Sequence, residues 1–331
     1  MKKSVRAGLT LALSVAAFAS QAEARTIVVT NDDGLTSNVV ALYKALKAQG
    51  HDVIVSVPCD NQSGMGAAIK VAQPLAPLAR ACRSGAAPVG APGAGAMQRE
   101  GIPTADFHYV DGTPVMAMLY GVEVLGAARW GKAPDLVLSG PNEGQNVGAA
   151  IMGSGTVSAA QMAAVNGIPA IALSAGMRTV DDKGLANPAS AKVAALSADL
   201  VARLDALAGA ARILPRGLAL NVNFPDALDG AKWEATRLGT YQAYDMRFVD
   251  DMARDASPMM KGMAKEYGMQ LPHLPGLSFG MNAAAPAPGQ EHDEGVVYRR
   301  AIAVSPMQAG FEPVALEGYG QWLVNVLEAK R

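Results

Sequence analysis

The sequence is poor in charged residues, aromatic residues and cysteine. Of its 331 residues, 17% are charged, 5% are aromatic and only two are cysteines. Its 28 Lys and Arg against 29 Asp and Glu give a net charge of -1, which leaves no basic surplus for nucleic-acid phosphates. The few rings also disfavour a base-stacking surface. We therefore expect no nucleic-acid duplex as a partner, and the 50% apolar content indicates a folded chain with a large core.

Long apolar runs are missing, apart from a short one at the start. Three basic residues among the first six precede an uncharged run over residues 7–19, which is shorter than the ~20 residues that span a bilayer. An Ala-Glu-Ala motif ending at Ala24 follows, as at a signal-peptidase site, and no twin-arginine pair precedes it. We predict a Sec signal peptide over residues 1–24 and a periplasmic or secreted protein, with no membrane contact after cleavage. A short buried first helix is the alternative.

The two cysteines, Cys59 and Cys82, leave two interpretations open. An oxidising compartment permits a disulfide between them, whereas two buried thiols are equally compatible with the sequence, because a bridge requires Cα atoms within about 7 Å. The four histidines are scattered and show no zinc-ligand spacing: His51, His108, His273 and His292.

Strand-like and helix-like segments alternate from residue 26 to about 225. This pattern predicts an α/β fold, with a doubly wound, Rossmann-like and mostly parallel sheet. Apolar, β-branched runs predict strands over 26–30, 52–57, 108–111, 135–138, 168–174 and 218–223. Helical patterns, the first of them capped by Ser37, cover residues 37–50, a segment starting at Pro114, 156–166 and 189–208.

The alternation ends near residue 240. We expect three parts: a signal peptide (1–24), a catalytic core (25–240) and a C-terminal extension (241–331) that forms the pocket edge and oligomer contacts. Residues 79–104 are rich in Gly, Ala and Pro and predict a flexible loop. Seven of the 16 methionines lie between residues 245 and 285. A late strand over 296–304 and a closing helix over 315–329 are also predicted.

Two adjacent carboxylates, Asp32 and Asp33, follow the first strand. Neighbouring carboxylates repel each other, so the pair is costly unless a cation offsets the charge. Hard divalent ions such as Mg²⁺ and Mn²⁺ prefer oxygen ligands. An ordinary Asp-rich turn is the alternative interpretation, and the residues farther along the chain bear on the choice.

Two further polar segments follow predicted strands. Glycines surround Asn142 and Asn146 in the loop after the fourth strand, and Ser154 to Thr156 open the next helix. Asn142 offers an oxygen to a metal, Asn146 offers donors to an anion, and free amides at a helix start bind phosphate. A metal beside such a cradle is suited to phosphate-ester hydrolysis. The candidate phosphate-binding residues are Asn146, Gly144, Ser154, Gly155 and Thr156.

The loop after the second strand contains a further candidate, Ser63, whose hydroxyl can supply an oxygen to the same cation. On its own the segment from Asp60 to Gly66 would be an ordinary polar loop. Its position makes it a candidate part of the binding site, because ligands of such sheets lie beyond the carboxyl ends of the strands.

Together these motifs resemble the SurE family of survival-protein nucleotidases, which are metal-dependent acid phosphatases acting on nucleoside monophosphates. The resemblance covers roughly residues 26–240 and is carried by Thr30-Asn-Asp-Asp-Gly34, Asn61-Gln-Ser-Gly64, Asp135 to Gly148, Gly153-Ser-Gly-Thr-Val-Ser-Ala-Ala160 and Leu220 to Pro225.

The resemblance implies a set of roles. Asp32, Asp33, Ser63 and Asn142 would hold one divalent metal per subunit, Mg or Mn, with Asp32, Asp33 and Asn142 as catalytic residues. The expected reaction is hydrolysis of a small phosphate ester by water activated at the metal. Homodimers or homotetramers joined through C-terminal elements are also implied. Which of the two aspartates acts as base or nucleophile stays open.

Other functions compete with this interpretation. A periplasmic solute-binding protein that holds an anion without hydrolysis would suit the signal peptide and the α/β pattern. The adjacent aspartates argue against it unless a metal is present. A cluster of Met259, Met260 and Met263 could bind copper(I) through soft thioethers, although methionine more often fills a core or an oligomer contact. His292, beside Asp293, is a further candidate for the pocket.

Overall fold

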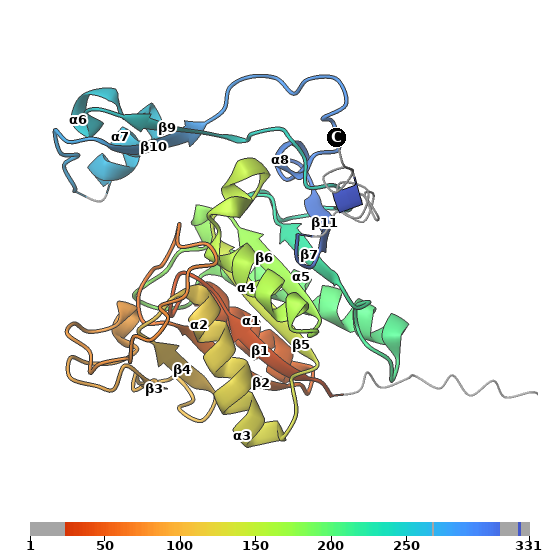
Figure 1. Ribbon diagram of the computed structural model, residues 1–331. Helices are drawn as coiled ribbons and strands as arrows, with labels where there is room; N and C mark the ends of the chain where they lie inside the picture. Colours follow the sequence, from red (N-terminus) through yellow and green to blue (C-terminus); the bar gives the residue numbers. More distant parts are fainter. Residues whose placement is uncertain (1–23, 267, 312–323, 326–331) are drawn as a thin grey trace, which may run out of the picture.

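A computed structural model describes residues 24–266, 268–311 and 324–325. The predicted signal segment, apart from Ala24, and nearly all of the predicted helix over 315–329 lie outside these residues. Within the described part, no helix is long and apolar enough to cross a bilayer. The main body is built on one large sheet, and a slender arm, defined here as residues 244–281, extends from it (Figure 1).

The main sheet has nine strands in the order β3-β4-β2-β1-β5-β6-β7-β11-β8. The strands from β4 to β7 in this order are parallel to their neighbours, whereas β3 and β11 run antiparallel to β4 and β7. This confirms the predicted doubly wound, mostly parallel α/β fold. The strands are Thr26–Thr30 (β1), Asp52–Pro58 (β2), Ala94–Ala96 (β3), Phe107–Val110 (β4), Leu136–Glu143 (β5), Ala170–Ala175 (β6), Leu218–Asn223 (β7), Trp233–Ala235 (β8) and Ile302–Gln308 (β11).

Helices cover both faces of the sheet (Figure 1). Along β1, Ile27 and Val29 pack in one core with α1 and α5, and Val28 packs in the opposite core with α2 and α4. This strand is therefore apolar on both faces, as is usual for parallel strands. The helices of the body are Ser37–Ala48 (α1), Pro114–Leu119 (α2), Ala127–Trp130 (α3), Gly155–Val165 (α4), Pro188–Ala208 (α5) and Glu294–Val297 (α8). A π-helical segment, Tyr120–Gly126 (η2), joins α2 to α3, and 3₁₀ turns lie at Arg83–Gly85 (η1), Gly148–Met152 (η3) and Met177–Thr179 (η4).

The helix starts follow from capping residues. Thr36, and not the predicted Ser37, caps α1 by accepting a hydrogen bond from the Val39 amide at 3.3 Å. Ser37 instead donates its hydroxyl hydrogen to the Thr179 carbonyl at 2.7 Å. Ser154 caps α4 in the same manner, accepting from the Val157 amide at 3.1 Å. These caps satisfy amides that a helix leaves free at its first turn.

Three expectations need correction. Residues 79–104 do not form a loose loop, because Cys82, Ala86 and Met97 are buried in the core and the segment includes η1 and β3. The strand predicted over 296–304 is instead the end of α8 followed by β11, which starts at Ile302. Because β11 pairs with β7, the main sheet continues past the expected boundary at residue 240.

The arm is an antiparallel pair of strands covered on one face by two helices. Its strands are Tyr244–Val249 (β9) and Gly276–Met281 (β10), and its helices are Met252–Asp255 (α6) and Pro258–Glu266 (α7). Val249, Met252 and Ala256 form a small separate core with Met260 packed against it. The arm therefore has its own small core. The chain leaves the body for the arm in the segment between β8 and β9.

Candidate active site

The two aspartates lie at the carboxyl end of β1, beside the point where the strand order reverses between β1 and β5. Ligands of doubly wound sheets bind at such a switch point. Both side chains are buried, with 2% of each residue exposed. Asp33 accepts hydrogen bonds from Asn61 Nδ2 at 3.0 Å and from the Glu143 amide at 2.9 Å. Asp32 accepts from the Thr156 hydroxyl at 2.6 Å.

Burial dominates the electrostatics of the pair. It raises the pKa of Asp32 above the ordinary value, against the lowering effect of the hydroxyl and amide of Thr156. Burial also raises the pKa of Asp33, and the negative charges of Asp32 and Glu143 raise it further, while Arg83 lowers it. Two buried, neighbouring carboxylates with few cationic neighbours are costly to ionise. The pair is therefore suited to a bound cation, which would offset that cost.

The start of α4 closely approaches Asp32. A Cβ placed on Gly155 would lie 2.7 Å from Asp32 Cβ and 2.4 Å from Pro114 Cγ, so only glycine fits there without movement. The hydroxyl of Thr156, predicted as a phosphate ligand, is instead bound to Asp32. The amides of Gly155 and Thr156 also stabilise the ionised form of Asp32. The start of α4 thus holds the aspartate, and its role toward phosphate stays a prediction.

Asn142 lies near the end of β5, beyond an irregularity in the pairing of β5 with β6. Its Nδ2 donates to the Gly144 carbonyl at 2.8 Å. Its Oδ1 is buried and has no hydrogen-bond partner among the described residues. Buried oxygens are rarely left unpaired, and a bound ion or water is one explanation for such a case. Because the next residue, Glu143, binds Asp33 through its amide, the structure brings Asn142 to the same strand ends as the aspartates.

The remaining predicted residues differ in their placement. Ser63 is exposed, and its backbone amide donates to Asn61 Oδ1 at 2.8 Å. Asn146 is buried and donates through Nδ2 to the Ser174 hydroxyl at 2.9 Å, while its carbonyl accepts from Asn221 and Asn223. Asn146 thus joins three strand ends, and its proposed contact with an anion stays a prediction.

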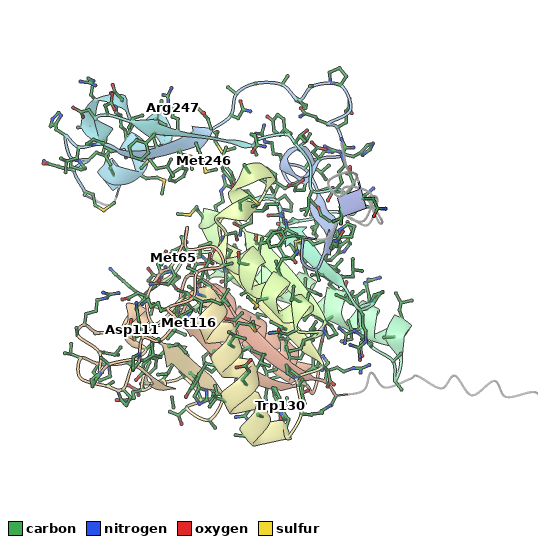
Figure 2. The ribbon with its side chains drawn as sticks, viewed as in Figure 1. Met65, Asp111, Met116, Trp130, Met246 and Arg247 are labelled. Atoms are coloured by element: carbon green, nitrogen blue, oxygen red, sulfur yellow. A yellow bond between two sulfur atoms is a disulfide. The ribbon has the colours of Figure 1, made fainter. Side chains whose placement is uncertain are left out.

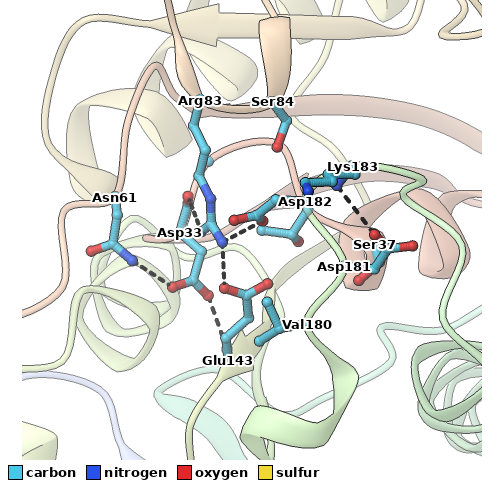
Figure 3. A network of polar contacts seen from close by, with 12 residues as sticks. Asp33, Ser37, Asn61, Arg83, Ser84, Glu143, Val180, Asp181, Asp182 and Lys183 are labelled. Carbon is cyan, nitrogen blue, oxygen red and sulfur yellow. Dashed lines mark hydrogen bonds and ion pairs between the residues drawn. The ribbon is translucent and has the colours of Figure 1, made fainter. Parts of the chain in front are cut away.

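Three residues that the sequence did not single out complete the polar network: Asn61, Arg83 and Glu143 (Figure 3). Arg83 donates to the Asp33 carbonyl at 2.8 Å and to Glu143 Oε2 at 2.8 Å. Burial raises the pKa of Glu143, against the lowering effect of Arg83. Asn61 and Glu143 lie within the motifs quoted above and could have been found from them, whereas nothing around Arg83 in the sequence indicates a site.

A cavity of about 520 Å³ adjoins this network. One wall is formed by the segment from Asn142 to Gln145, and the opposite wall is formed by the arm. Figure 2 shows Met246 on the arm, across from the loops of the body that carry Met65. The lining is rich in thioethers and rings, with Arg178 and Asp226 as charged members. The apolar lining residues are Ala150, Met177, Tyr244, Met246, Met259, Met263, Phe279, Met281 and Tyr298.

The structure separates the three methionines that were candidate copper(I) ligands. Met259 and Met263 line the cavity, whereas Met260 packs in the core of the arm, where its sulfur accepts a hydrogen bond from the Phe279 amide at 3.2 Å. The three thioethers therefore do not share one site. His292 does not line the cavity either, and its exposed ring lies 3.9 Å from Glu234.

The fold and the site together define a class: α/β proteins with a buried carboxylate pair at the switch point of a parallel sheet. Comparison with known proteins identifies the family within that class. The family model described as survival protein SurE matches residues 27–245, and the chain belongs to the SurE family. The predicted resemblance is thereby confirmed.

Individual relatives agree with this assignment. The chain is 36% identical over 207 residues to an acid phosphatase of Yarrowia lipolytica, a match that covers 60% of this chain and 56% of that protein. It is 34% identical over 237 residues to the 5'-nucleotidase SurE of Methanothermobacter thermautotrophicus, covering 69% of this chain and 79% of that protein. The crystal structure of the SurE protein from Aquifex aeolicus is similar, with a TM-score of 0.61, 26% identity, and coverage of 90% of this chain and 99% of that one. The chain thus spans little more than half the length of the Yarrowia protein.

Proposed function

We propose that this chain is a phosphomonoesterase that hydrolyses nucleoside monophosphates or similar small phosphate esters with one divalent metal per subunit. The observation that carries the proposal is the buried pair Asp32 and Asp33, together with Asn142 at the end of the neighbouring strand, whose buried Oδ1 has no partner among the described residues. All three residues lie at the strand ends, and Asn142 lines a cavity large enough for a small ligand. The activities named for the relatives, acid phosphatase and 5'-nucleotidase, support it.

The donor set fits a hard divalent ion, Mg²⁺ or Mn²⁺. Asp32, Asp33 and Asn142 would supply carboxylate and amide oxygens, which such ions prefer, and Ser63 would supply a hydroxyl. The raised pKa values of both aspartates show that burial disfavours their ionised forms, so a cation would relieve a real electrostatic cost. When bound, such a metal polarises the phosphoryl group and lowers the pKa of water.

The residues of this chain hold the site in shape. Asn61 and the Glu143 amide fix both oxygens of Asp33, and Thr156 fixes one oxygen of Asp32. Such fixed groups need little rearrangement during reaction, which is the main source of electrostatic catalysis. The apolar wall of the cavity offers a surface for a nucleobase or another apolar leaving group, while the phosphate would lie at the Asn142 end.

The test measures turnover of AMP and of p-nitrophenyl phosphate with Mg²⁺ or Mn²⁺ present. We expect hydrolysis of both, abolition by a chelator, and a loss of about 10³-fold or more in kcat for Asp32→Asn, because a fixed charged group of the site is removed. Asp229→Asn, whose carboxylate is exposed and forms an ion pair with Lys192, is the matched control and should remain active. Turnover that survives both chelation and Asp32→Asn would refute the proposal. Retention of the ester without turnover would identify a solute-binding protein instead.

We further propose that the protein is exported. The buried Cys59–Cys82 bridge, with an Sγ–Sγ distance of 2.04 Å, supports an oxidising compartment. At the expected new terminus, the Arg25 amide donates to His51 Nδ1 at 3.1 Å and the Arg25 side chain pairs with buried Asp205 at 2.6 Å. Cell fractionation followed by N-terminal sequencing should recover a chain that starts at Arg25.

A further inference from the structure

Arg83 lies directly beside the disulfide. The bridge joins Cys59, the residue after β2, to Cys82, the residue before η1, and it crosses 23 positions of sequence. Both cysteines are buried. The Arg83 amide donates to the Cys59 carbonyl at 2.9 Å and to Asp60 Oδ1 at 3.0 Å. The backbone of Arg83 is thus attached to the end of β2 by one covalent bridge and two hydrogen bonds.

The guanidinium of Arg83 contacts three other segments (Figure 3). Nη1 donates to the Asp33 carbonyl after β1 at 2.8 Å. Nη2 donates to Glu143 Oε2 at the end of β5 at 2.8 Å and to Asp182 Oδ1, in the loop after η4, at 2.5 Å. A planar guanidinium suits such a multiple contact, because its donors lie in a fixed fork. One side chain therefore connects the segments that carry the carboxylates and Asn142.

Arg83 also balances the charge of the largely buried Glu143 carboxylate. Its side chain is 16% exposed and that of Glu143 is 7% exposed, so the pair is screened little by water. Within the described part of the chain, no second basic side chain forms an ion pair with Asp32, Asp33 or Glu143. Glu143 in turn holds Asp33 Oδ2 through its amide. Removing Arg83 would leave a buried Glu143 carboxylate unpaired next to that contact.

We propose that Arg83 is a positioning residue for Asp33 and Asn142, and that the Cys59–Cys82 disulfide holds Arg83 in place, so that full activity requires the oxidised chain. The inference rests on the proposed function, because the groups being positioned are the proposed metal ligands. Arg83 touches neither of those side chains directly. It acts through the Asp33 carbonyl and through Glu143, which follows Asn142 in β5.

The first experiment compares Arg83→Met and Arg83→Lys with Arg80→Met. Arg80 lies in the same loop, is exposed and forms an ion pair with Asp60, so it is a matched control. We expect Arg83→Met to lower kcat by about 10- to 100-fold with little change in KM for p-nitrophenyl phosphate. Lysine should restore only part of the loss, because it lacks the fork. Arg80→Met should behave as wild type.

A binding measurement separates positioning from general stability. Mn²⁺ affinity is measured without substrate, by the electron paramagnetic resonance signal of free Mn²⁺, at a temperature where thermal melts show each variant folded. We expect Arg83→Met to bind Mn²⁺ at least tenfold more weakly than wild type or Arg80→Met. If Arg83→Met is folded and retains both kcat and Mn²⁺ affinity within twofold, the positioning role is wrong.

The second experiment tests the bridge with the double variant Cys59→Ala/Cys82→Ala. We expect kcat and Mn²⁺ affinity to fall as in Arg83→Met, and the triple variant to be no worse than Arg83→Met alone. Such non-additivity indicates that the two changes remove one interaction. Full activity in the double variant, or losses that simply add in the triple variant, would overturn the role of the bridge.

Reduction of the wild-type protein gives an independent test should the double variant fail to fold. A dithiol transfers two electrons and two protons to the bridge, which leaves the Cys59 and Cys82 thiols and the cyclic disulfide of the reagent. Loss of Mn²⁺ affinity in step with thiol appearance supports the role of the bridge, and unchanged affinity after complete reduction overturns it. If the wild type binds Mn²⁺ but lacks turnover, the proposed function fails, while the Mn²⁺ comparison still decides the role of Arg83.

Discussion

Gly155 is the residue on which the position of Asp32 depends most directly. It begins α4 where a Cβ would overlap both Asp32 and Pro114, at 2.7 Å and 2.4 Å from their nearest carbons. Neither neighbour is a flexible side-chain end, because one carries a buried carboxylate and the other is a proline ring. Because this residue is glycine, α4 can pack closely against Asp32 without displacing its carboxylate.

We predict that Gly155→Ala lowers kcat by at least about 100-fold and destabilises the fold by about 1–3 kcal/mol, the usual cost of overpacking. Gly262→Ala is the control, since Gly262 lies within α7 with open space around its Cβ position and alanine is the better helix former. Turnover of p-nitrophenyl phosphate and thermal melts measure the two effects. Normal activity in Gly155→Ala would show that Asp32 does not need its present position.

The buried aspartates also predict how stability depends on pH in the absence of metal. Because burial raises the folded-state pKa of Asp32 above its ordinary value of 3.8, the folded chain binds that proton more tightly than the unfolded chain. The free energy of unfolding contributed by this group is therefore greatest at low pH and is lost as pH rises through the folded pKa.

The Asp32→Asn variant should not show this loss of stability with rising pH. In the presence of a chelator at pH 7, we expect the variant to be more stable than wild type by about 1 kcal/mol, as is common when a strained site is relaxed. The difference should be smaller at pH 4, because lowering the pH favours protonation of the wild-type carboxyl, whose pKa burial raises. Added Mg²⁺ should stabilise wild type and leave the variant unchanged. Denaturant titrations at the two pH values measure this, and a wild type that is more stable than Asp32→Asn at pH 7 without metal contradicts it.

At the scale of elements, α7 and the strands of the arm form one wall of the cavity. Met259 and Met263 lie four residues apart on α7, so they share a face of the helix, and both line the cavity. Met246 and Met281 reach the same cavity from neighbouring strands. Thioethers adapt to irregular apolar ligands, which would suit this wall to the leaving group of the proposed substrate.

We predict that Met263→Gln raises KM for AMP by about fivefold while kcat changes little, because about 1 kcal/mol of apolar contact is replaced by an amide that must be desolvated. Met269→Gln is the matched control, since Met269 is exposed and does not line the cavity. Steady-state kinetics with AMP measure both variants. Equal KM values for Met263→Gln and wild type would remove the arm from the substrate site.

At the scale of the molecule, the arm leaves an apolar face uncovered. Directly opposed residues of β9 and β10 share a face, and the pairs Met246 with Phe279 and Phe248 with Leu277 are opposed. Phe248 and Leu277 are 72% and 56% exposed. Contiguous exposed apolar surface is typical of a contact site, and the homodimer or homotetramer that the family resemblance implies stays a prediction.

We predict that Phe248→Glu reduces the oligomer to a monomer, because association would bury a charge without a partner. Leu207→Glu serves as the control, since Leu207 is the comparably exposed apolar residue of α5 in the body. Light scattering after size-exclusion chromatography gives the mass of each species. A monomeric wild type, or a Phe248→Glu variant that remains associated, would place the contact elsewhere or exclude it.

The sequence by itself determined the alternating sheet and the location of the aspartates. The β-branched run over β1 and the apolar run over β7 are strands at the predicted bounds, since local patterning suffices for buried parallel strands. That Asp32, Asp33 and Asn142 lie at the same edge of the sheet was predictable, because the carboxyl ends of neighbouring parallel strands lie together. Short edge strands such as β3 and β8 have too few residues to show a pattern.

Only the tertiary structure decided the polar network and the cavity. Arg83 meets Glu143 across 60 positions of sequence, and Glu143 meets Asp33 across 110, so no local pattern records these contacts. Likewise, the sequence left open a copper(I) site at Met259, Met260 and Met263, but the packing of the arm separates Met260 from the other two. Hydrophobic periodicity sets which face of an element is buried, whereas the partner of a polar side chain depends on how distant elements pack together.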